Sequence, residues 1–553
     1  MNRRDFFRYG MAFGTALNAP AVLADPPVQP SPPTAPAGAR PGRDDLAIVN
    51  AKVITLDPQQ PSAQAVLVRG GRIVHVGATS DVRAKAGAAR IFDAGGRAVV
   101  PGFIDAHTHM EVALSHEMYA VDVHVPPLKN IREIQAALSA KAAHTPKGQW
   151  VIGRAGFNLE NSLPEKRLPN RQDLDEISQD HPIIIFSGRH ISMLNSRALK
   201  EIGMWDAAAA KPPMGTTIHR DGSGVPTGLA SEVFYFLPEF SVDQMKAAMR
   251  GRAKGLFTDK GTTTIYAIPF SANDIRADLD LQRAGELPLR IRMFYHVPHM
   301  TSLEGLLNMG YPSGVGDDMF RFGGMKLFVD GTGGDAEGHR YDDLKWTQDE
   351  LNHMLSSADA VGVQVIMHVV TDGGLRMATA AIEETRRRNP TKPYLVHRIE
   401  HGGDRGGLDA VRHLRDLGIR ISITPGRGRP NATRPRYKTL VREGMYPIGI
   451  TDTTGTTPGS SDAWFKIACI AATADEGGGA PVGEALGFED ALRMFTLWNA
   501  QIGYEDRDKG SIVAGKLGDF VMLSGDPTSV RPRDLFAMKV DATILGGTVV
   551  HQR

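Results

Sequence analysis

A pair of histidines separated by one residue is the first feature of this sequence that could do chemistry. His107 and His109 follow an apolar run that begins at Val99. In a strand, side chains two residues apart point to the same side, so both imidazoles could face one metal ion. The pair alone is a weak signal, but its place at the end of an apolar run makes a metal site the first hypothesis.

A lysine lies within a second apolar run. Lys326 stands in the stretch 322–329, and Asp330 follows directly. Burying an ammonium group costs free energy unless the group is neutralised, modified or reaches solvent. The sequence therefore predicts either a lysine that takes part in the site or one whose amine emerges at a strand end.

Histidine ends two further apolar runs, and an aspartate follows a late polar one. The histidines are His368 and His401. Asp462 follows residues 457–461 and, taken alone, is typical of a helix N-cap. In a parallel barrel, however, the carboxyl ends of all strands meet at one mouth, where catalytic groups gather. We therefore expect these side chains to lie near His107 and His109.

The elements that must position these residues are predicted by alternation. Between residues 99 and 503, apolar β-rich runs alternate with helical stretches such as 351–361 and 374–388. This order favours βαβ units and a parallel sheet or barrel. Short alternating strands precede the region, at 46–54 and 65–77, and similar strands follow it. They predict one small β domain built from both ends of the chain.

Composition places the chain among globular proteins. Its 553 residues are 42% hydrophobic and 23% charged, without an apolar run long enough for a membrane span. The net charge of +1 gives no reason to expect nucleic acid or an anionic surface as partner. The single cysteine, Cys469, excludes an internal disulfide and a cysteine-based zinc site. Metal chemistry must therefore rest on histidines and carboxylates.

The amino-terminal residues resemble an export signal followed by a spacer. Arg3 and Arg4 precede a mildly apolar stretch, and residues 22–24 are typical of a signal-cleavage site. This order is similar to a twin-arginine signal over residues 1–24, which implies the twin-arginine export machinery as partner and a periplasmic or secreted location. A disordered charged tail or an ordinary secretory signal is the alternative. The proline-rich residues 25–45 predict an extended linker.

Taken together, the motifs resemble the amidohydrolase superfamily, and in particular its YtcJ-like branch, which includes N-substituted formamide deformylases. The order of His-x-His, strand lysine, two strand histidines and a late aspartate carries the resemblance. Further matching stretches are 189–190, 195–199, 220–228 with Glu232, 326–331, 397–401 and 509–519. The resemblance implies a (β/α)8 TIM-type barrel at residues 99–503, with an insertion near 112–250. It also implies a small β-sandwich built from both termini, residues 46–98 and 504–553.

The resemblance further implies a metal centre. Its ligands would be His107, His109, Lys326, His368, His401 and Asp462. Two zinc ions per chain are expected, with manganese, iron or cobalt as alternatives, and Lys326 would bridge them in a carboxylated form. Asp462 would take a proton from the activated water and return it to the leaving amine, with His401 beside it. His190 would help to polarise the scissile carbonyl, and Asp330 and Arg427 would join it in contacting substrate.

The function implied is hydrolysis of an amide-type C–N bond in a small molecule, such as an N-substituted formamide or an N-acyl compound. Thr371, Gly374, Thr424 and Ser460 depart from the family pattern near the mouth and leave the acyl and amine parts of the substrate open. A lactone, ester or carbamate hydrolase is the alternative, as is a non-hydrolytic C–C lyase or isomerase on the same barrel. A protein that only binds its ligand has no need of the lysine and the aspartate. Neither nucleic acid nor a stable membrane anchor is expected, and a homodimer stays open.

Overall fold

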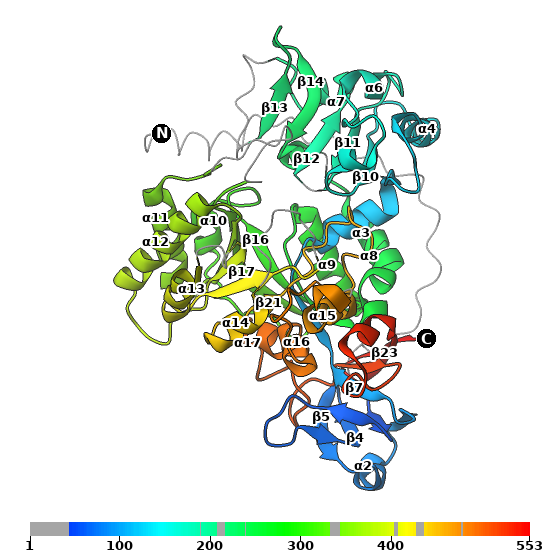
Figure 1. The fold of residues 1–553 in the computed structure, drawn as a ribbon, viewed down its shortest axis with the longest axis vertical. Helices are drawn as coiled ribbons and strands as arrows, with labels where there is room; N and C mark the ends of the chain where they lie inside the picture. Colours follow the sequence, from blue (N-terminus) through cyan, green and yellow to red (C-terminus); the bar gives the residue numbers. More distant parts are fainter. Residues whose placement is uncertain are drawn as a thin grey trace.

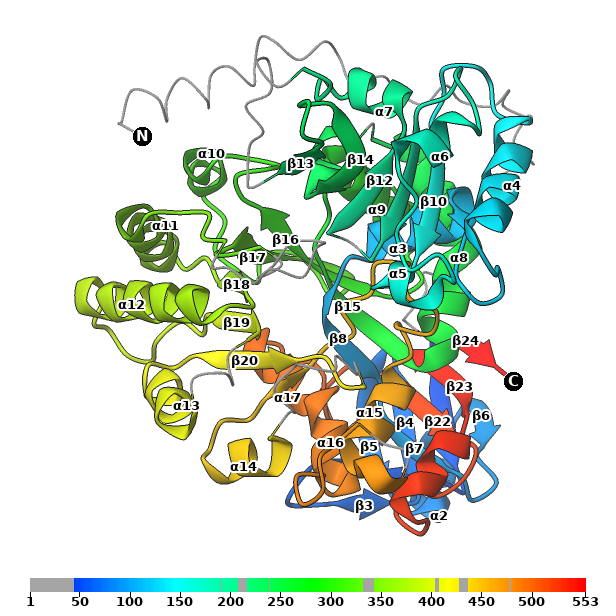
Figure 2. The same cartoon turned by 45° about the horizontal axis from the view of Figure 1, so that its top comes forward.

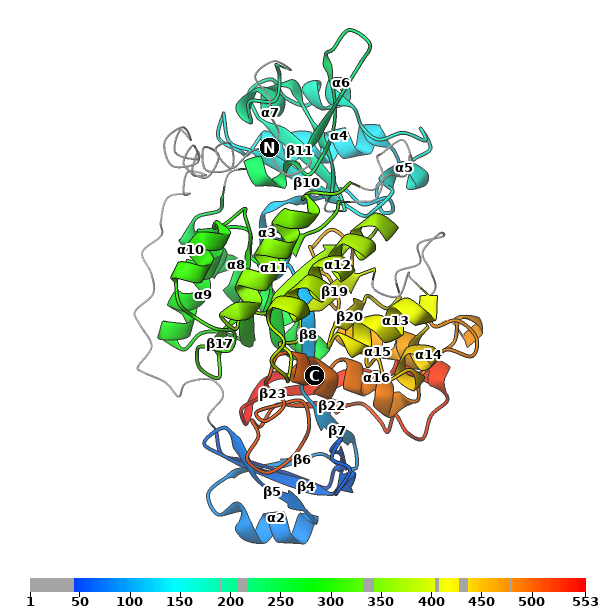
Figure 3. The same cartoon turned by 90° about the vertical axis from the view of Figure 1, so that its left-hand side faces the viewer.

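The computed structural model describes residues 44–188, 190–206, 216–237, 239–331, 343–402, 407–426, 436–476 and 479–553. These residues form three tiers along the long axis of the molecule (Figure 1). A β domain lies at one end, a barrel in the middle and a second α/β unit at the other end, and the side view shows the same order (Figure 3). The predicted export signal lies outside the described residues, as does the predicted linker up to residue 43.

The middle tier is a barrel of eight strands, each parallel to its sheet neighbours. In chain order they are β8 (Phe103–Thr108), β15 (Thr262–Ala267), β16 (Arg290–His296), β17 (Phe320–Phe328), β18 (Val365–Val369), β19 (Arg398–His401), β20 (Arg420–Ile423) and β21 (Ile448–Gly449). Backbone hydrogen bonds connect the first barrel strand, β8, to the segment just after the last one, β21. The amide of Asp452 donates to the carbonyl of His107 at 2.9 Å, and the amide of His109 donates to the carbonyl of Thr453 at 3.0 Å. The predicted (β/α)8 barrel is confirmed.

Helices cover the outside of the barrel (Figure 2). α11 (Gln348–Ala360) and α12 (Asp372–Arg388) overlap the two helical stretches that the sequence predicts. Each begins after a threonine, Thr347 or Thr371, whose hydroxyl accepts a hydrogen bond from the amide three residues later. The other helices of this tier are α3 (Met110–Tyr119), α8 (Val242–Leu256), α9 (Ala272–Ala284), α10 (Leu303–Asn308), α13 (Gly407–Asp416), α14 (Tyr437–Arg442), α15 (Ala463–Ala471), α16 (Phe488–Met494) and α17 (Leu497–Ile502). Across the described ranges, no helix combines the length and hydropathy needed to cross a lipid bilayer.

The β domain joins the two ends of the chain, as the sequence predicts. One sheet has the order β24 (Thr548–Gln552), β23 (Val540–Leu545), β22 (Phe520–Leu523), β7 (Ala98–Pro101), β2 (Lys52–Ile54) and β3 (Ser62–Ala63). The other has the order β5 (Arg72–Gly77), β4 (Ala65–Arg69), β1 (Leu46–Val49) and β6 (Arg90–Asp93), with α2 (Thr79–Ala86) beside it. The link between the chain ends is the antiparallel pair β7 and β22, in which Val100 lies opposite Val521. Their buried side chains, such as Val99 and Phe520, belong to one apolar core.

The third tier is inserted between β8 and β15. Its sheet has the order β13 (Thr217–Arg220), β14 (Pro226–Ser231), β12 (Ile191–Leu194), β11 (Ile183–Ser187), β10 (Val151–Ala155) and β9 (Val121–Asp122). Its helices are α4 (Ile131–Ala142), α5 (Leu159–Ser162), α6 (Arg171–Asp175) and α7 (Ser196–Glu201). Leu138 and Ile185 are fully buried in a separate core. The chain returns to the barrel along α8, which packs beside α3.

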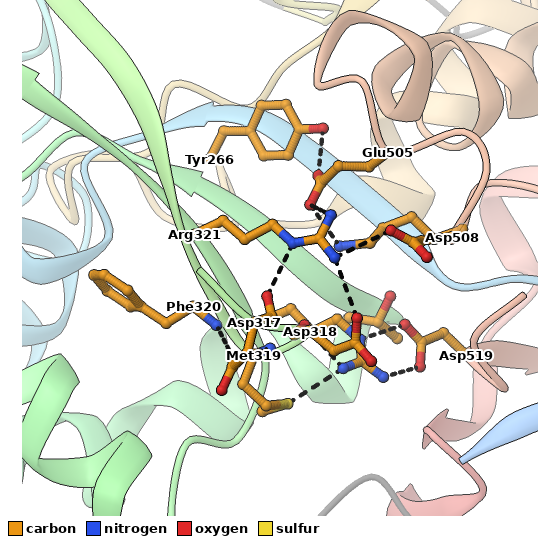
Figure 4. Close-up of polar contacts among 12 residues, drawn as sticks. Tyr266, Asp317, Asp318, Met319, Phe320, Arg321, Glu505, Asp508 and Asp519 are labelled. Atoms are coloured by element: carbon orange, nitrogen blue, oxygen red, sulfur yellow. Dashed lines mark hydrogen bonds and ion pairs between the residues drawn. The ribbon is translucent and has the colours of Figure 1, made fainter. Parts of the chain in front are cut away.

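Buried ion pairs connect the β domain to the end of the barrel opposite its mouth (Figure 4). Arg290 of β16 donates to both carboxylate oxygens of Asp519, at 2.7 and 2.8 Å. Arg321 of β17 lies 3.4 Å from Glu505, which also accepts a hydrogen bond from the hydroxyl of Tyr266 at 2.9 Å. Because both carboxylates belong to the segment that leads into β22, the network holds the β domain against the end of the barrel that lies opposite its mouth.

Candidate active site

Three side chains with metal-ligand chemistry meet where the barrel closes. His107 and His109 lie at the end of β8, and Asp452 lies just beyond β21. Asp452 Oδ1 is 3.6 Å from His107 Nε2 and 3.7 Å from His109 Nε2. Both histidines are buried, and the spacing of the three groups lets one ion contact all of them.

Hydrogen bonds orient the imidazoles of His107 and His109 so that their Nε2 atoms face Asp452. His107 Nδ1 lies 2.7 Å from Oε2 of Glu400, and His109 Nδ1 lies 3.2 Å from the carbonyl oxygen of Ile268. Both partners are acceptors, so each Nδ1 carries the proton and each Nε2 presents its lone pair to the site. Glu400 was not predicted to lie at the site, because a carboxylate next to His401 in a strand is expected to point away from it.

Asp452, and not Asp462, is the aspartate beside the histidines. Asp462 is the N-cap of α15, and its carboxylate accepts the amide of Phe465 at 2.9 Å. The prediction for Asp462 was therefore wrong in position, and the more ordinary alternative, a helix cap, describes that residue. The signal for Asp452 was present, because Ile448 and Ile450 form an apolar run that ends at an aspartate. That run is the same kind of strand ending that identified His368.

Lys326 lies fully buried in β17. Its Nζ has no hydrogen-bond partner among the described residues and stands 4.9 Å from the ring centre of Phe328. Burial lowers the pKa of Lys326 to about 8, although Glu400 and Asp452 nearby act in the opposite direction. The amine does not snorkel to solvent, so the structure places this lysine inside the barrel, as the resemblance implies.

His368 and His401 lie next to each other on β18 and β19. Their ring centroids are 4.9 Å apart, and the ring of His401 is 5.1 Å from that of His107. Burial lowers the pKa of His401 to about 3 and holds that of His368 well below its usual range. Both imidazoles are therefore neutral at physiological pH, which is the protonation state that a metal ligand needs.

The barrel mouth is encircled by a closed ring of seven aromatic side chains. In order around the mouth they are His107, His109, Phe270, His296, Phe328, His368 and His401, with neighbouring centroids 4.7–5.4 Å apart. One half consists of the predicted metal ligands. The other half, Phe270, His296 and Phe328, was not predicted. His296 ends β16, but Arg290 and Arg292 in that strand make its signal weaker than that of His368, and nothing in the sequence marks Phe270.

His190 reaches the mouth from the inserted tier. Its ring lies 5.7 Å from that of His368, and its Nδ1 lies 2.8 Å from Oε1 of Glu232. Glu232 accepts from Nδ1, so Nε2 of His190 is the nitrogen left to meet a substrate. Arg427, also predicted to contact substrate, lies outside the described residues.

Asp330 has a different position from the one predicted. It is fully buried, and its carboxylate accepts hydrogen bonds from the amides of Val370 and Thr371, at 3.0 and 2.8 Å, and from the hydroxyl of Thr371 at 2.8 Å. Burial raises its pKa to about 6 despite these bonds. Its oxygens are used to hold the turn between β18 and α12, so the structure does not support the predicted contact with substrate.

Two buried polar atoms that lack hydrogen-bond partners among the described residues indicate that a divalent ion fits this site. His107 Nε2 and Lys326 Nζ are both buried without a hydrogen-bond partner among the described residues. A buried polar atom left unpaired costs about 1–3 kcal/mol. Imidazole nitrogens and carboxylate oxygens are ligands that suit zinc and related ions, and such an ion would satisfy His107 Nε2.

Comparison with known sequences identifies the family. A sequence profile described as the Amidohydrolase family matches residues 90–551. The chain belongs to the amidohydrolase family. It is therefore a hydrolase of carbon–nitrogen bonds other than peptide bonds, and the predicted resemblance is confirmed.

Relatives match this amidohydrolase over nearly its whole length. The N-substituted formamide deformylase of Arthrobacter pascens is 29% identical over 546 residues, which cover 92% of this chain and 98% of that protein. The putative amidohydrolase YtcJ of Bacillus subtilis is 24% identical over 91% of this chain and 98% of its own.

Solved structures support the fold of this amidohydrolase. An uncharacterized metal-dependent hydrolase from Pyrococcus furiosus superposes with a TM-score of 0.65 at 21% identity, covering 88% of this chain and all of its own. An adenosine deaminase from Xanthomonas campestris, solved with bound zinc, has a TM-score of 0.53 at 15% identity, covering 92% and 93% of the two chains.

Proposed function

We propose that this amidohydrolase cleaves an amide-type C–N bond, such as that of an N-substituted formamide or N-acyl compound, with a divalent ion at the barrel mouth. His107, His109 and Asp452 would hold the ion, and His368, His401 and Lys326 would supply the donors for a second one. The observation that carries the proposal is the convergence of His107, His109 and Asp452 within reach of one ion, with His107 Nε2 left without a hydrogen-bond partner among the described residues. The formamide deformylase relative supports the choice of bond.

Asp452, His190 and Glu232 have different roles in the proposed hydrolysis. When bound, the divalent ion lowers the pKa of water and polarises a carbonyl oxygen. Asp452 accepts the proton of the attacking water and returns it to the departing amine, the role predicted for Asp462. His190 donates from Nε2 to the carbonyl oxygen as negative charge develops there. Glu232, bonded to His190 Nδ1, keeps that ring in the orientation needed.

We also propose that Lys326 is carboxylated. Its neutral amine would add to carbon dioxide, forming a carbamate and releasing one proton, so that an uncharged buried group becomes an anion. The ammonium form would first lose a proton of its own. The burial of its unpaired Nζ, which lowers the pKa of Lys326 to about 8, supports this chemistry, because it favours the neutral amine that reacts with carbon dioxide. A carbamate has two oxygens and could therefore contact two ions, which is the basis for proposing two ions and not one.

The part of the ring without predicted metal ligands, Phe270, His296 and Phe328, supports the proposal that the substrate carries an apolar substituent. Phe270 and Phe328 flank His296 opposite the metal half. Apolar walls bury apolar surface of a ligand when it binds. Substrates that carry an apolar group next to the scissile bond should therefore be favoured over fully polar ones.

An activity screen tests the proposal. Zinc-loaded protein would be offered N-substituted formamides, N-acyl amines, carbamates and lactones, with products measured in water enriched in ¹⁸O. Release of an amine, with ¹⁸O in the acid product, supports C–N hydrolysis. Turnover of lactones or carbamates alone would shift the assignment to those bonds. Product without solvent oxygen would contradict hydrolysis and favour the lyase or isomerase alternative.

We propose, from the sequence of residues 1–24, that the protein is exported by the twin-arginine machinery. Arg3 and Arg4 are the pair on which this depends. Cell fractionation of the native chain and of an Arg3→Lys, Arg4→Lys variant tests it. Export of the native chain and retention of the variant support the proposal, and equal export of both would contradict it.

A further inference from the structure

Glu400 is a buried carboxylate to which the proposed hydrolysis assigns no role. It lies fully buried in β19. Its Oε2 is 2.7 Å from His107 Nδ1, and its Oε1 accepts from Nε of Arg398 at 2.8 Å. We infer that Arg398 and Glu400 form a positioning pair that fixes the tautomer and the direction of His107 for metal binding.

The first step concerns the proton on His107. A neutral imidazole carries one proton on one of its two nitrogens, and the acceptor that it meets decides which. Glu400 accepts at Nδ1, so the proton stays there. Nε2 then keeps its lone pair, and this is the nitrogen 3.6 Å from Asp452 Oδ1. Without Glu400, both tautomers become accessible and part of the protein presents a protonated Nε2 to the metal.

The second step concerns Arg398, whose guanidinium is fully buried. Besides its bond to Glu400, it donates from Nη2 to the carbonyl oxygen of Ala106 at 2.7 Å. Ala106 is the residue before His107, so Arg398 holds the backbone of β8 while Glu400 holds the imidazole. The two contacts together leave His107 little freedom to rotate or shift. Carboxylate partners of metal-bound histidines commonly have this orienting effect.

The third step is the backbone geometry that lets Glu400 face inward. Arg398 and Glu400 are two residues apart and share one side of β19, so His401 should point to the opposite side. His401 instead has φ 74°, in the left-handed region, which is unfavourable for a residue with a side chain. This conformation returns the ring of His401 to within 5.1 Å of that of His107. The strain allows consecutive residues to serve the same site, one as ligand and one as positioner.

The inference rests on the proposed metal site, and zinc affinity tests it without substrate. Metal-free wild-type protein and a Glu400→Gln variant would be titrated with zinc against a chromophoric chelator. The matched control is Glu383→Gln, because Glu383 also accepts from an imidazole, that of His413 at 2.7 Å, but on the exposed surface of the barrel. Circular dichroism and thermal unfolding of the metal-free proteins establish that each variant folds.

The expected result is a loss of zinc affinity of about 10–100-fold in Glu400→Gln and none in Glu383→Gln. Nitrogen NMR of ¹⁵N-histidine-labelled, metal-free protein should show one imidazole, assigned with a His107→Gln variant, changing from a single tautomer to a mixture. Glu400→Asp keeps the charge and should lose less affinity than Glu400→Gln. Unchanged zinc affinity in folded Glu400→Gln would overturn the inference.

Two further outcomes keep this test separate from that of the proposed function. If Glu400→Gln does not fold, Glu400→Asp is compared with Glu383→Asp, and equal zinc affinities would again overturn the inference. If the wild-type protein binds no zinc or other divalent ion, the proposed metal site fails and the positioning role fails with it. Normal zinc binding by the wild type, with no effect of either Glu400 variant, contradicts the positioning role alone.

Discussion

Asp105 holds Thr451 across the seam where the barrel closes. Its carboxylate accepts hydrogen bonds from the backbone amide of Thr451, at 3.0 Å, and from the threonine hydroxyl. Thr451 directly precedes Asp452, whose φ of 50° places it in the left-handed region. A conformation of that kind persists only when its surroundings hold it. Asp105 thus positions, from β8, the aspartate that faces His107 and His109.

Replacing Asp105 with alanine should weaken both the fold and the metal site. The buried amide of Thr451 would lose its acceptor, which costs about 1–3 kcal/mol, while, among the described residues, the hydroxyl would keep only Thr108 Oγ1, 3.3 Å away. Urea unfolding of the metal-free protein measures this cost, and a zinc titration measures the effect on the site. Asp105→Asn keeps one acceptor oxygen and should lose less of both. Wild-type zinc affinity in Asp105→Ala would contradict the anchoring role.

Loss of Lys326 should abolish most activity and should be partly reversible. In Lys326→Ala, an added short-chain carboxylate could occupy the space of the proposed carbamate and restore part of kcat. Lys326→Arg should stay inactive, because a permanent cation cannot ligate a metal. In the wild type, ¹³C-labelled bicarbonate should give a carbamate signal in the carbon NMR spectrum.

Lys466 provides the control for this experiment. It is also buried, but its Nζ donates to the carbonyl oxygen of Pro425 at 2.9 Å. Lys466→Ala should lower stability without any rescue by carboxylates. Near-normal turnover by Lys326→Arg would show that Lys326 is a structural residue and not a bridge.

Glu505 should contribute stability that depends on pH. Burial alone raises its pKa, but Lys509, Arg292 and Arg321 outweigh burial and lower it to about 2. The pKa of an unfolded glutamate is about 4.3. The stabilisation is therefore complete above about pH 4.3 and is lost as the pH falls toward about 2, because protons then favour the unfolded chain.

A Glu505→Gln variant tests this assignment. It leaves the neighbouring cations without their carboxylate, and breaking such a buried pair typically costs about 3–5 kcal/mol. The difference in Tm between wild type and variant should be constant from pH 8 to about pH 5 and should shrink at lower pH. The matched control is Glu384→Gln, because Glu384 pairs with Arg387 and Arg388 at the surface of α12 and its loss should change Tm little. A difference that grows on acidification would contradict the sign.

The sequence predicts this fold well because its strands are short apolar runs whose ends carry polar residues. His368 and His401 end such runs, and their convergence follows from the parallel barrel alone. The β domain could be placed by chain segment for the same reason, whereas the insertion was placed only by the family resemblance. The ring neighbours Phe270 and His296 could not be paired with one another from the sequence, since aromatic contacts between strand ends depend on side-chain rotamers.

Two features of the site could not be predicted because local backbone geometry departs from the sequence pattern. Glu400 and His401 are consecutive residues that face one site, which strand alternation forbids and the left-handed φ of His401 permits. Asp330 follows Lys326 by four residues in the sequence, but its carboxylate accepts hydrogen bonds from the amides of Val370 and Thr371. Neither exception can be predicted from residue type or spacing.

The same substitution, aspartate to asparagine, distinguishes the roles of Asp452 and Asp462. Asp452→Asn keeps the shape of the side chain but cannot accept a proton, so kcat should fall by about 10²–10⁴-fold while KM changes little. Asp462→Asn should be nearly silent, because asparagine is as good an N-cap as aspartate and can still accept the amide of Phe465. Both variants would be assayed after zinc loading, with bound metal measured, so that lost chemistry is distinguished from lost metal. Near-wild-type kcat in zinc-replete Asp452→Asn, or a collapse of kcat in Asp462→Asn with α15 intact, would return the role to the later aspartate.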